Sequence, residues 1–425
     1  MLLSMSTLVS LSAAIALSCS AISCGQQASA HSVVASKQAV HTSDEVAPLS
    51  DKPLQGFQLE LIDLAFETAS ALPAQPHLKN RARLQESVVA ACFELDQPQR
   101  ALAYIEKIDN WRRAAGYADY AFYCAEHGST KDVQRYLDLA AKNSPIVEDD
   151  STQDWQRDRI KATIAKTHVL MGEADKAVRF ETGIVDSEMG MIAEVRARLL
   201  TPEAFDREIQ TIDSVVATNN FDQVRNALAN CTRFFDRFYA DKERRTLAEQ
   251  KIKTSWAKLP IVVRIGLMKE LAGIAVQHRD TAKALELVDE TQALVDAAQW
   301  TPEDRIPLMA RMAELRFGAG DIEKARTEVA AALALFDAER EKIVNIYRAE
   351  VLRPVAEAHQ SMGDQPAALT TYKRVVEEGV VNPNSRPRTE DLSATCCSMA
   401  VHGVEPDTAL KARVQEIHDG LGTPW

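Results

Sequence analysis

The stretch Leu170-Met171-Gly172-Glu173-Ala174-Asp175-Lys176-Ala177 contains a pattern that recurs along most of this 425-residue chain. A turn residue, Gly172, is followed five positions later by Ala177 and preceded seven positions earlier by Ala165. The same spacing returns around Gly320 and Gly363. Self-similarity of this kind is typical of proteins built from stacked helical repeats.

Eight turn positions carry the pattern. They are Asp96, Gly128, Gly172, Asn219, Arg279, Gly320, Gly363 and Gly403. The residues five positions later are Ala101, Val133, Ala177, Val224, Ala284, Ala325, Ala368 and Thr408. The residues seven positions earlier are Val89, Ala121, Ala165, Ile212, Ala272, Ala313, Ala356 and Cys396. Small side chains on both sides of a tight turn let two antiparallel helices pack closely, so each copy predicts a helical hairpin.

Helix start signals agree with this spacing. Thr201-Pro202-Glu203 and Thr301-Pro302-Glu303-Asp304 each combine an N-cap, a proline in the first turn and acidic residues, which is typical of helix N-termini. We therefore predict an all-α fold, a right-handed α-solenoid of stacked antiparallel helix hairpins.

The stretches Leu170 to Ala177 and Gly320-Asp321-Ile322-Glu323-Lys324-Ala325 resemble the turn region of tetratricopeptide repeats (TPRs). The resemblance extends over roughly residues 77 to 420. Successive turns are 32 to 60 residues apart, so the array is TPR-like but irregular. We assign residues 57–425 to this domain. A break is expected near 239–258, where the densely charged segment beginning at Asp241 forms a connector between two parts of the array.

The first 30 residues carry no charged side chain. An apolar stretch, Leu8 to Leu17, precedes Ala28-Ser29-Ala30, which has the small-x-small pattern of a signal-peptidase site. Residues 1–30 are predicted to be a signal peptide and residues 31–56 a flexible linker. The expected location is the periplasm or cell envelope. In an alternative reading, the chain is lipid-anchored through Cys19 or Cys24.

Composition excludes several classes of function. With 49 basic and 61 acidic residues the net charge is −12, so nucleic acid is not an expected partner. We find no nucleotide-binding loop, zinc-protease helix or nucleophile elbow. We therefore expect no enzymatic activity, no cofactor and no metal. The cysteines beyond residue 30 are few and odd in number, which predicts core packing rather than disulfides.

The resemblance also implies a binding surface. In TPR arrays the first helix of each hairpin lines a concave groove that holds segments of partner proteins. Spacing from the turns assigns to this groove Arg83, Glu86, Arg159, Lys166, Lys269, Glu314, Arg353, Glu357 and Gln360. The expected function is non-catalytic protein–protein interaction or scaffolding. The alternative is an enzyme, or a regulatory domain of a partner enzyme, built on an α-solenoid.

Overall fold

The computed structural model describes residues 49–143 and 154–424. Within these ranges the chain forms nineteen α-helices and two short 3-10 helices, and no β-strand. The predicted all-α class is therefore confirmed for the described part of the chain.

The helices fall into two sets. The even-numbered helices are α2 (Ala74–Glu94), α4 (Arg112–Glu126), α6 (Asp154–Leu170), α8 (Asp186–Arg198), α10 (Phe221–Arg237), α12 (Ile261–Gln277), α14 (Pro302–Gly318), α16 (Arg348–Ser361) and α18 (Ser385–Val401). The odd-numbered helices are α1 (Gly56–Ala71), α3 (Pro98–Ile105), α5 (Val133–Asn143), α7 (Ala174–Glu181), α9 (Pro202–Ala217), α11 (Lys242–Ser255), α13 (Thr281–Asp296), α15 (Ile322–Glu339), α17 (Gln365–Gly379) and α19 (Thr408–Asp419). The 3-10 helices are η2 (Trp256–Lys258) and η3 (Asn345–Tyr347).

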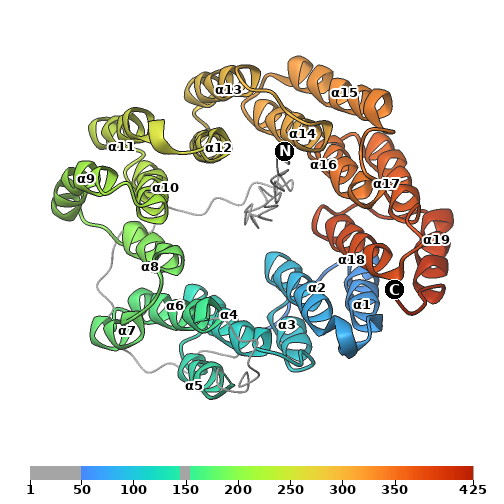
Figure 1. The fold of residues 1–425 in the computed structure, drawn as a ribbon. Helices are drawn as coiled ribbons and strands as arrows, with labels where there is room; N and C mark the ends of the chain where they lie inside the picture. The colour runs from blue at the N-terminus through green and yellow to red at the C-terminus, as the bar shows by residue number, and fades with distance from the viewer. Residues whose placement is uncertain (1–48, 144–153, 425) are drawn as a thin grey trace, which may run out of the picture. The chain divides into compact units, whose positions relative to one another are not determined.

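The even-numbered helices contact one another in sequence. Each one from α2 to α16 packs on the next, and α18 packs back on α2, so these contacts form a closed circuit (Figure 1). Most odd-numbered helices pack on the even-numbered helix that precedes them. The exceptions are α9, which packs on α10 and α11, and α1, which packs on α2 and α18.

The eight predicted turns all have left-handed backbone. Their φ angles lie between 54° at Asp96 and 90° at Gly320. In each, the turn amide donates to the carbonyl three residues earlier, as in Gly363 N to Gln360 O at 2.9 Å. In most turns, the amide of the next residue donates to the carbonyl five residues before it, as in Asp364 N to His359 O at 2.9 Å. This is the Schellman arrangement, which satisfies carbonyls that a helix end leaves without partners.

Small residues flanking the turns are buried, as the spacing predicts. All eight positions seven residues before a turn are buried, and so are seven of the eight positions five residues after one. The exception is the exposed Thr408 at the start of α19. Close packing around the turns accounts for the small side chains.

Two features depart from a regular alternation of hairpins. Helix α8 packs between α6 and α10, which lengthens the interval between Gly172 and Asn219. The Asn219 turn then joins α9 to α10, so it leads from an odd-numbered to an even-numbered helix. The charged segment near 239–258 forms α11 and η2, and α11 packs on α10 with Ala248 and Ile252 buried.

The first helix, α1, packs against α18, the last helix but one. The Ser393 hydroxyl of α18 donates to the Ala65 carbonyl of α1 at 3.0 Å, and Gln58 Nε2 donates to the Ala400 carbonyl at 2.8 Å. One hydrophobic cluster contains buried residues from both ends of the described region, from Phe57 to Ile164 and from Ala356 to Ile417. The sequence offers no indication of this contact, because the residues that form it are more than 300 positions apart.

Part of the predicted linker is held in place. The amide of Lys52 donates to Asp96 O at 3.0 Å, and Gln97 Nε2 donates to Lys52 O at 2.7 Å. The predicted signal peptide, residues 1–30, lies outside the described residues. Within the described ranges, none of the helices has the length and apolar character needed to span a bilayer.

Candidate binding site

All nine predicted groove residues lie on even-numbered helices. Arg83 and Glu86 are on α2, Arg159 and Lys166 on α6, Lys269 on α12, Glu314 on α14, and Arg353, Glu357 and Gln360 on α16. The closed circuit of contacts runs through all five of these helices, but only α12, α14 and α16 follow one another directly in it.

Several of the predicted residues bind each other or a neighbouring helix. Arg83 Nη2 lies 2.9 Å from Glu390 Oε1 on α18. Arg159 Nη2 lies 2.9 Å from Glu86 Oε1, and so joins α6 to α2. Such ion pairs fix the spacing of adjacent helices, which sequence spacing alone does not reveal.

A pocket of about 290 Å³ lies between α2, α4 and α6. Its lining residues are Glu86, Val89, Ala90, Phe93, Ile108, Arg112, Gly116, Asp119, Phe122, Tyr123, Glu126 and Arg159. Two predicted groove residues, Glu86 and Arg159, are among them. This volume is close to the lower end of the range for ligand sites, about 300–1,000 Å³.

Two arginines that line one end of the pocket contact the neighbouring Trp111 and the lining residue Glu86. The guanidinium carbon of Arg112 lies 4.5 Å from the ring centroid of Trp111, and that of Arg159 lies 5.6 Å from it. Glu86 pairs with Arg159 at 2.9 Å and lies 3.4 Å from Arg112 Nη1. One carboxylate therefore serves two guanidinium groups.

Arg112 is incompletely paired. Its Nε and Nη1 are buried and have no hydrogen-bond partner among the described residues. Burial lowers the pKa of Arg112, Glu86 opposes this shift, and the charges of Arg159 and Arg83 add to it. For Arg159, burial is outweighed by Glu86 and Asp119, which raise its pKa. The two arginines thus have different surroundings within one pocket.

Aromatic side chains form another wall of the pocket. The rings of Phe93 and Tyr123 stack with their centroids 5.0 Å apart. Lys166 Nζ lies 4.1 Å from the centroid of Phe122, a cation–π contact between α6 and α4. Phe122 is six residues before Gly128, as Lys166 is six residues before Gly172. The spacing from the turn therefore places Phe122 at the same position as the predicted residue Lys166. The prediction omitted Phe122 because it selected polar residues only.

Acidic residues lie farther along α4. Asp119 and Glu126 follow Arg112 by seven and fourteen residues, which corresponds to about 10 and 21 Å along a helix. Glu126 Oε1 pairs with Arg198 Nη1 on α8 at 2.9 Å. The pocket thus has a cationic end where α4 begins and an acidic side along the helix. Neither Arg112 nor Asp119 was predicted from sequence.

Three predicted residues of α14 and α16, Glu314, Arg353 and Glu357, belong to a buried cluster around Glu357. The buried Oε1 of Gln360, by contrast, has no hydrogen-bond partner among the described residues. The Glu357 carboxylate pairs with Arg311 and accepts a hydrogen bond from Ser398. Burial would raise the pKa of Glu357, but the charges of Arg311, His402 and Arg353 lower it to about 2. Glu314 pairs with Arg311 at 2.8 Å. This cluster links α14, α16 and α18, and it lines neither of the two pockets described.

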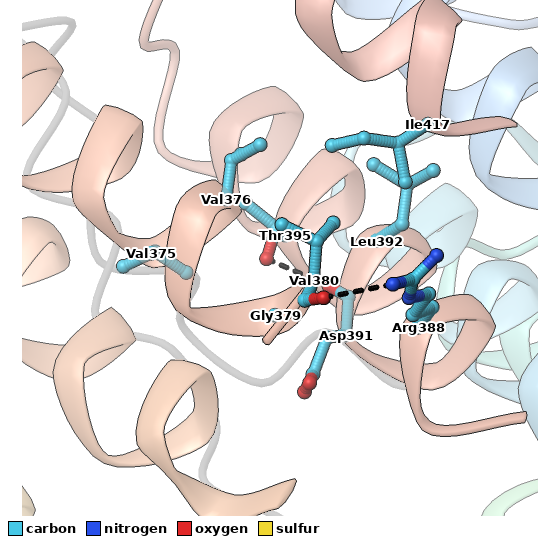
Figure 2. A pocket seen from close by; sticks show the side chains of 9 residues that line it. All are labelled: Val375, Val376, Gly379, Val380, Arg388, Asp391, Leu392, Thr395 and Ile417. Atoms are coloured by element: carbon cyan, nitrogen blue, oxygen red, sulfur yellow. Dashed lines mark hydrogen bonds between the residues drawn. The ribbon is translucent and has the colours of Figure 1, made fainter. Parts of the chain in front are cut away.

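A much smaller cavity, of about 10 Å³, lies between α17, α18 and α19 (Figure 2). Arg388 Nη2 donates to the Val380 carbonyl at 3.0 Å, at the end of α17. Asp391 lines the cavity, and burial raises the pKa of Asp391 to about 7 despite the opposing charge of Arg353. This volume is about that of one water probe, too small for an organic ligand.

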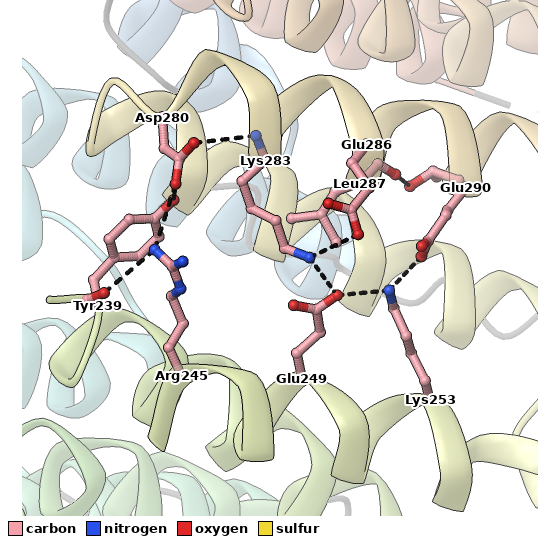
Figure 3. A network of polar contacts seen from close by, with 10 residues as sticks. Tyr239, Arg245, Glu249, Lys253, Asp280, Lys283, Glu286, Leu287 and Glu290 are labelled. Carbon is pink, nitrogen blue, oxygen red and sulfur yellow. Dashed lines mark hydrogen bonds and ion pairs between the residues drawn. The ribbon is translucent and has the colours of Figure 1, made fainter. Parts of the chain in front are cut away.

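A network of polar contacts joins α11 to α13 (Figure 3). The buried Glu249 accepts hydrogen bonds from Lys253 Nζ at 2.6 Å and Lys283 Nζ at 2.7 Å. Beside it, Tyr239 Oη donates to Asp280 Oδ2 at 3.0 Å. These contacts connect neighbouring odd-numbered helices and surround no described pocket, so we assign them a structural role.

Comparisons with known proteins add no family to this description. No protein-family model matches the sequence, and no curated protein matches it at a significant level. A solved structure, Ton1535 from Thermococcus onnurineus NA1, is 14% identical, with a TM-score of 0.20; the match covers 80% of this chain and 98% of that chain. In residues 49–143 and 154–424, no group of three or more His, Cys, Asp or Glu side chains is arranged to hold a metal ion.

Proposed function

We propose that this chain is a non-catalytic interaction or scaffold protein of the periplasm or cell envelope, exported by residues 1–30. Its helices would form an irregular, right-handed TPR-like solenoid. A segment of a partner protein binds across α2, α4 and α6, beside the predicted residues Arg159 and Lys166.

The observation that carries this proposal is the pocket shared by α2, α4 and α6. Charged and aromatic side chains from three successive even-numbered helices line it. Their positions are fixed by contacts within the chain, such as Glu86 with Arg159 and Lys166 with Phe122. A surface that is already ordered loses little conformational entropy when a partner docks.

The alternative of an enzyme finds less support. An active site needs acids, bases or nucleophiles that converge on a space for substrate. The acid Glu357 is buried among Arg311, Arg353 and Ser398 and lines neither described pocket. Its surroundings neutralise its charge rather than expose it to a substrate.

In-cell crosslinking tests the proposed surface. A photoreactive residue introduced at exposed position 90, on the rim of the pocket, should capture one specific partner. Arg159→Glu combined with Lys166→Glu should reduce its recovery about tenfold or more, because reversing two charges makes attractive contacts repulsive.

The matched control is Arg157→Glu, on the same helix. Arg157 is half-exposed and lies 3.8 Å from Asp154, outside the pocket. Recovery should be unchanged in this variant. Equal recovery from the double variant and the wild type would rule out the proposed surface.

Cell fractionation tests the proposed location. The mature chain should be recovered outside the cytoplasm, with its first residue near His31. A chain that keeps residues 1–30 in the cytoplasm would contradict export, and lipid attached at Cys19 or Cys24 would favour the anchored alternative.

A further inference from the structure

The pocket between α2, α4 and α6 has unused hydrogen-bonding capacity at Arg112. Its Nε and Nη1 are buried without hydrogen-bond partners among the described residues. Leaving a buried donor unpaired costs about 1–3 kcal/mol, and more when the group is charged. An oxyanion in the pocket would accept a charge-assisted hydrogen bond from the unpaired Nε–H of this guanidinium, whose Nη1 lies 3.4 Å from Glu86.

Arg112 is the less well compensated of the two arginines at this end. Glu86 lies near both, but Asp119 and Glu188 also stabilise the charge of Arg159, whereas among the described residues Glu86 alone does so for Arg112. Helix α4 begins at Arg112, and the N-terminus of a helix contributes a further partial positive charge. Asp119 lies about two helical turns farther along, at about 10 Å.

The remainder of the pocket suits an apolar body. Val89, Phe93, Ile108 and Phe122 line it. The volume of about 290 Å³ admits a small molecule but no folded element. Aromatic walls favour flat ligands, because offset-stacked and edge-to-face contacts add to the burial of apolar surface.

We propose that this pocket binds a small organic anion with a flat apolar body, its oxyanion held by Arg112 and Arg159 and its body against Phe93 and Phe122. This inference uses the same pocket as the protein partner proposed above, but its test needs only the purified chain and no partner. A carboxylate and a phosphate share the required chemistry, so both are included in the test.

Isothermal titration of the purified chain with phenylacetate and with phenyl phosphate tests the site and distinguishes the two anions. Tighter binding of one identifies the anion. The uncharged analogue phenylacetamide should bind about tenfold more weakly or not at all, because it lacks the charge that strengthens hydrogen bonds to a guanidinium. Inorganic phosphate should also bind more weakly than phenyl phosphate, since it lacks the apolar body.

Arg112→Gln should lower the affinity for the aromatic anion at least about tenfold, whereas Arg157→Gln should leave this affinity unchanged. Should Arg112→Gln fail to fold, Phe122→Leu provides a second test. This variant keeps both arginines. It should therefore lower the affinity for the aromatic anion and leave the affinity for inorganic phosphate unchanged. No binding of either aromatic anion at millimolar concentration, or equal binding by wild type and Arg112→Gln, would overturn the proposal.

Discussion

At the scale of single residues, Asp391 is a partly buried acid whose ionisation opposes folding. Its Cβ lies close to the end of α17, where a Cβ added to Gly379 would be 3.0 Å from it. Burial raises its pKa from an ordinary value of 3.8 to about 7. The folded state therefore holds the proton more tightly than the unfolded chain. This contribution to stability is complete below about pH 3.8 and is lost as pH rises through about 7.

Asp391→Asn should therefore stabilise the protein above pH 7 and have little effect near pH 4. The amide resembles the protonated acid but cannot ionise. We expect a gain of about 1–3 kcal/mol at pH 8, because each tenfold difference in proton affinity between the folded and unfolded states is worth about 1.4 kcal/mol and partial solvation reduces the total. Urea unfolding at pH 4, 6 and 8 measures it. The exposed Asp296→Asn controls for the loss of one negative charge, and a gain for Asp391→Asn that did not vary with pH would contradict this account.

Glu249 offers a second prediction at this scale. It is 6% exposed and accepts hydrogen bonds from Lys253 and Lys283. Glu249→Gln should destabilise the protein by about 1–3 kcal/mol, because two partly buried ammonium groups lose their shared carboxylate. The matched control is Glu290→Gln. Glu290 also contacts Lys253, but its side chain is 42% exposed, so its loss should cost less than about 1 kcal/mol. Thermal unfolding measures the loss of stability in each variant. Equal losses in the two variants would be evidence against a special role for Glu249.

At the scale of elements, the turns permit a comparison between glycine and other residues. Arg279 has a φ of 57°, and its exposed side chain makes no hydrogen bond or ion pair within the described ranges. Gly363 has a φ of 77°, and a Cβ added there would meet nothing within 4 Å. Side-chain contacts therefore contribute little at either position, and the backbone conformation decides the effect.

Arg279→Gly should stabilise the protein and Gly363→Ala should destabilise it, each by about 1 kcal/mol, because L-residues with a Cβ are strained in left-handed backbone. Chemical denaturation of the two variants measures both signs in one experiment. Ala297→Gly, at an exposed position in right-handed backbone after α13, serves as the control for glycine itself and should not stabilise. A loss of stability in Arg279→Gly would show that the side chain, rather than the backbone, determines the effect at this turn.

The turns were also the best-predicted part of the structure. A turn with left-handed backbone and the small residues around it are local features, so spacing around Gly172 or Gly320 was enough to place them. The role of α8 was not local, since it depends on contacts with both α6 and α10. The sequence likewise placed Arg159 and Glu86 on a shared surface but not in an ion pair, because pairing depends on side-chain directions across two helices. Arg112 was not predicted, because the absence of hydrogen-bond partners among the described residues for its buried Nε and Nη1 cannot be inferred from sequence.

At the scale of the whole described region, contact between α1 and α18 changes how the helices should unfold. In an open repeat array, terminal repeats contact one neighbour and fray first. Here α1 and α18 share a buried interface, with Ser393 donating to the Ala65 carbonyl. Neither helix is a free end, so both should resist hydrogen exchange as long as the central helices do.

Ala65→Met should expose this coupling. Ala65 is fully buried, and a larger side chain there should cost about 1–3 kcal/mol by overpacking. Hydrogen exchange should then become faster in both α1 and α18, by about tenfold for each 1.4 kcal/mol. The matched variant Ala325→Met alters an equally buried alanine between α14 and α15, and its effect should centre on those two helices. Faster exchange confined to α1 in Ala65→Met, with exchange in α18 unchanged, would show that α1 and α18 unfold independently of each other.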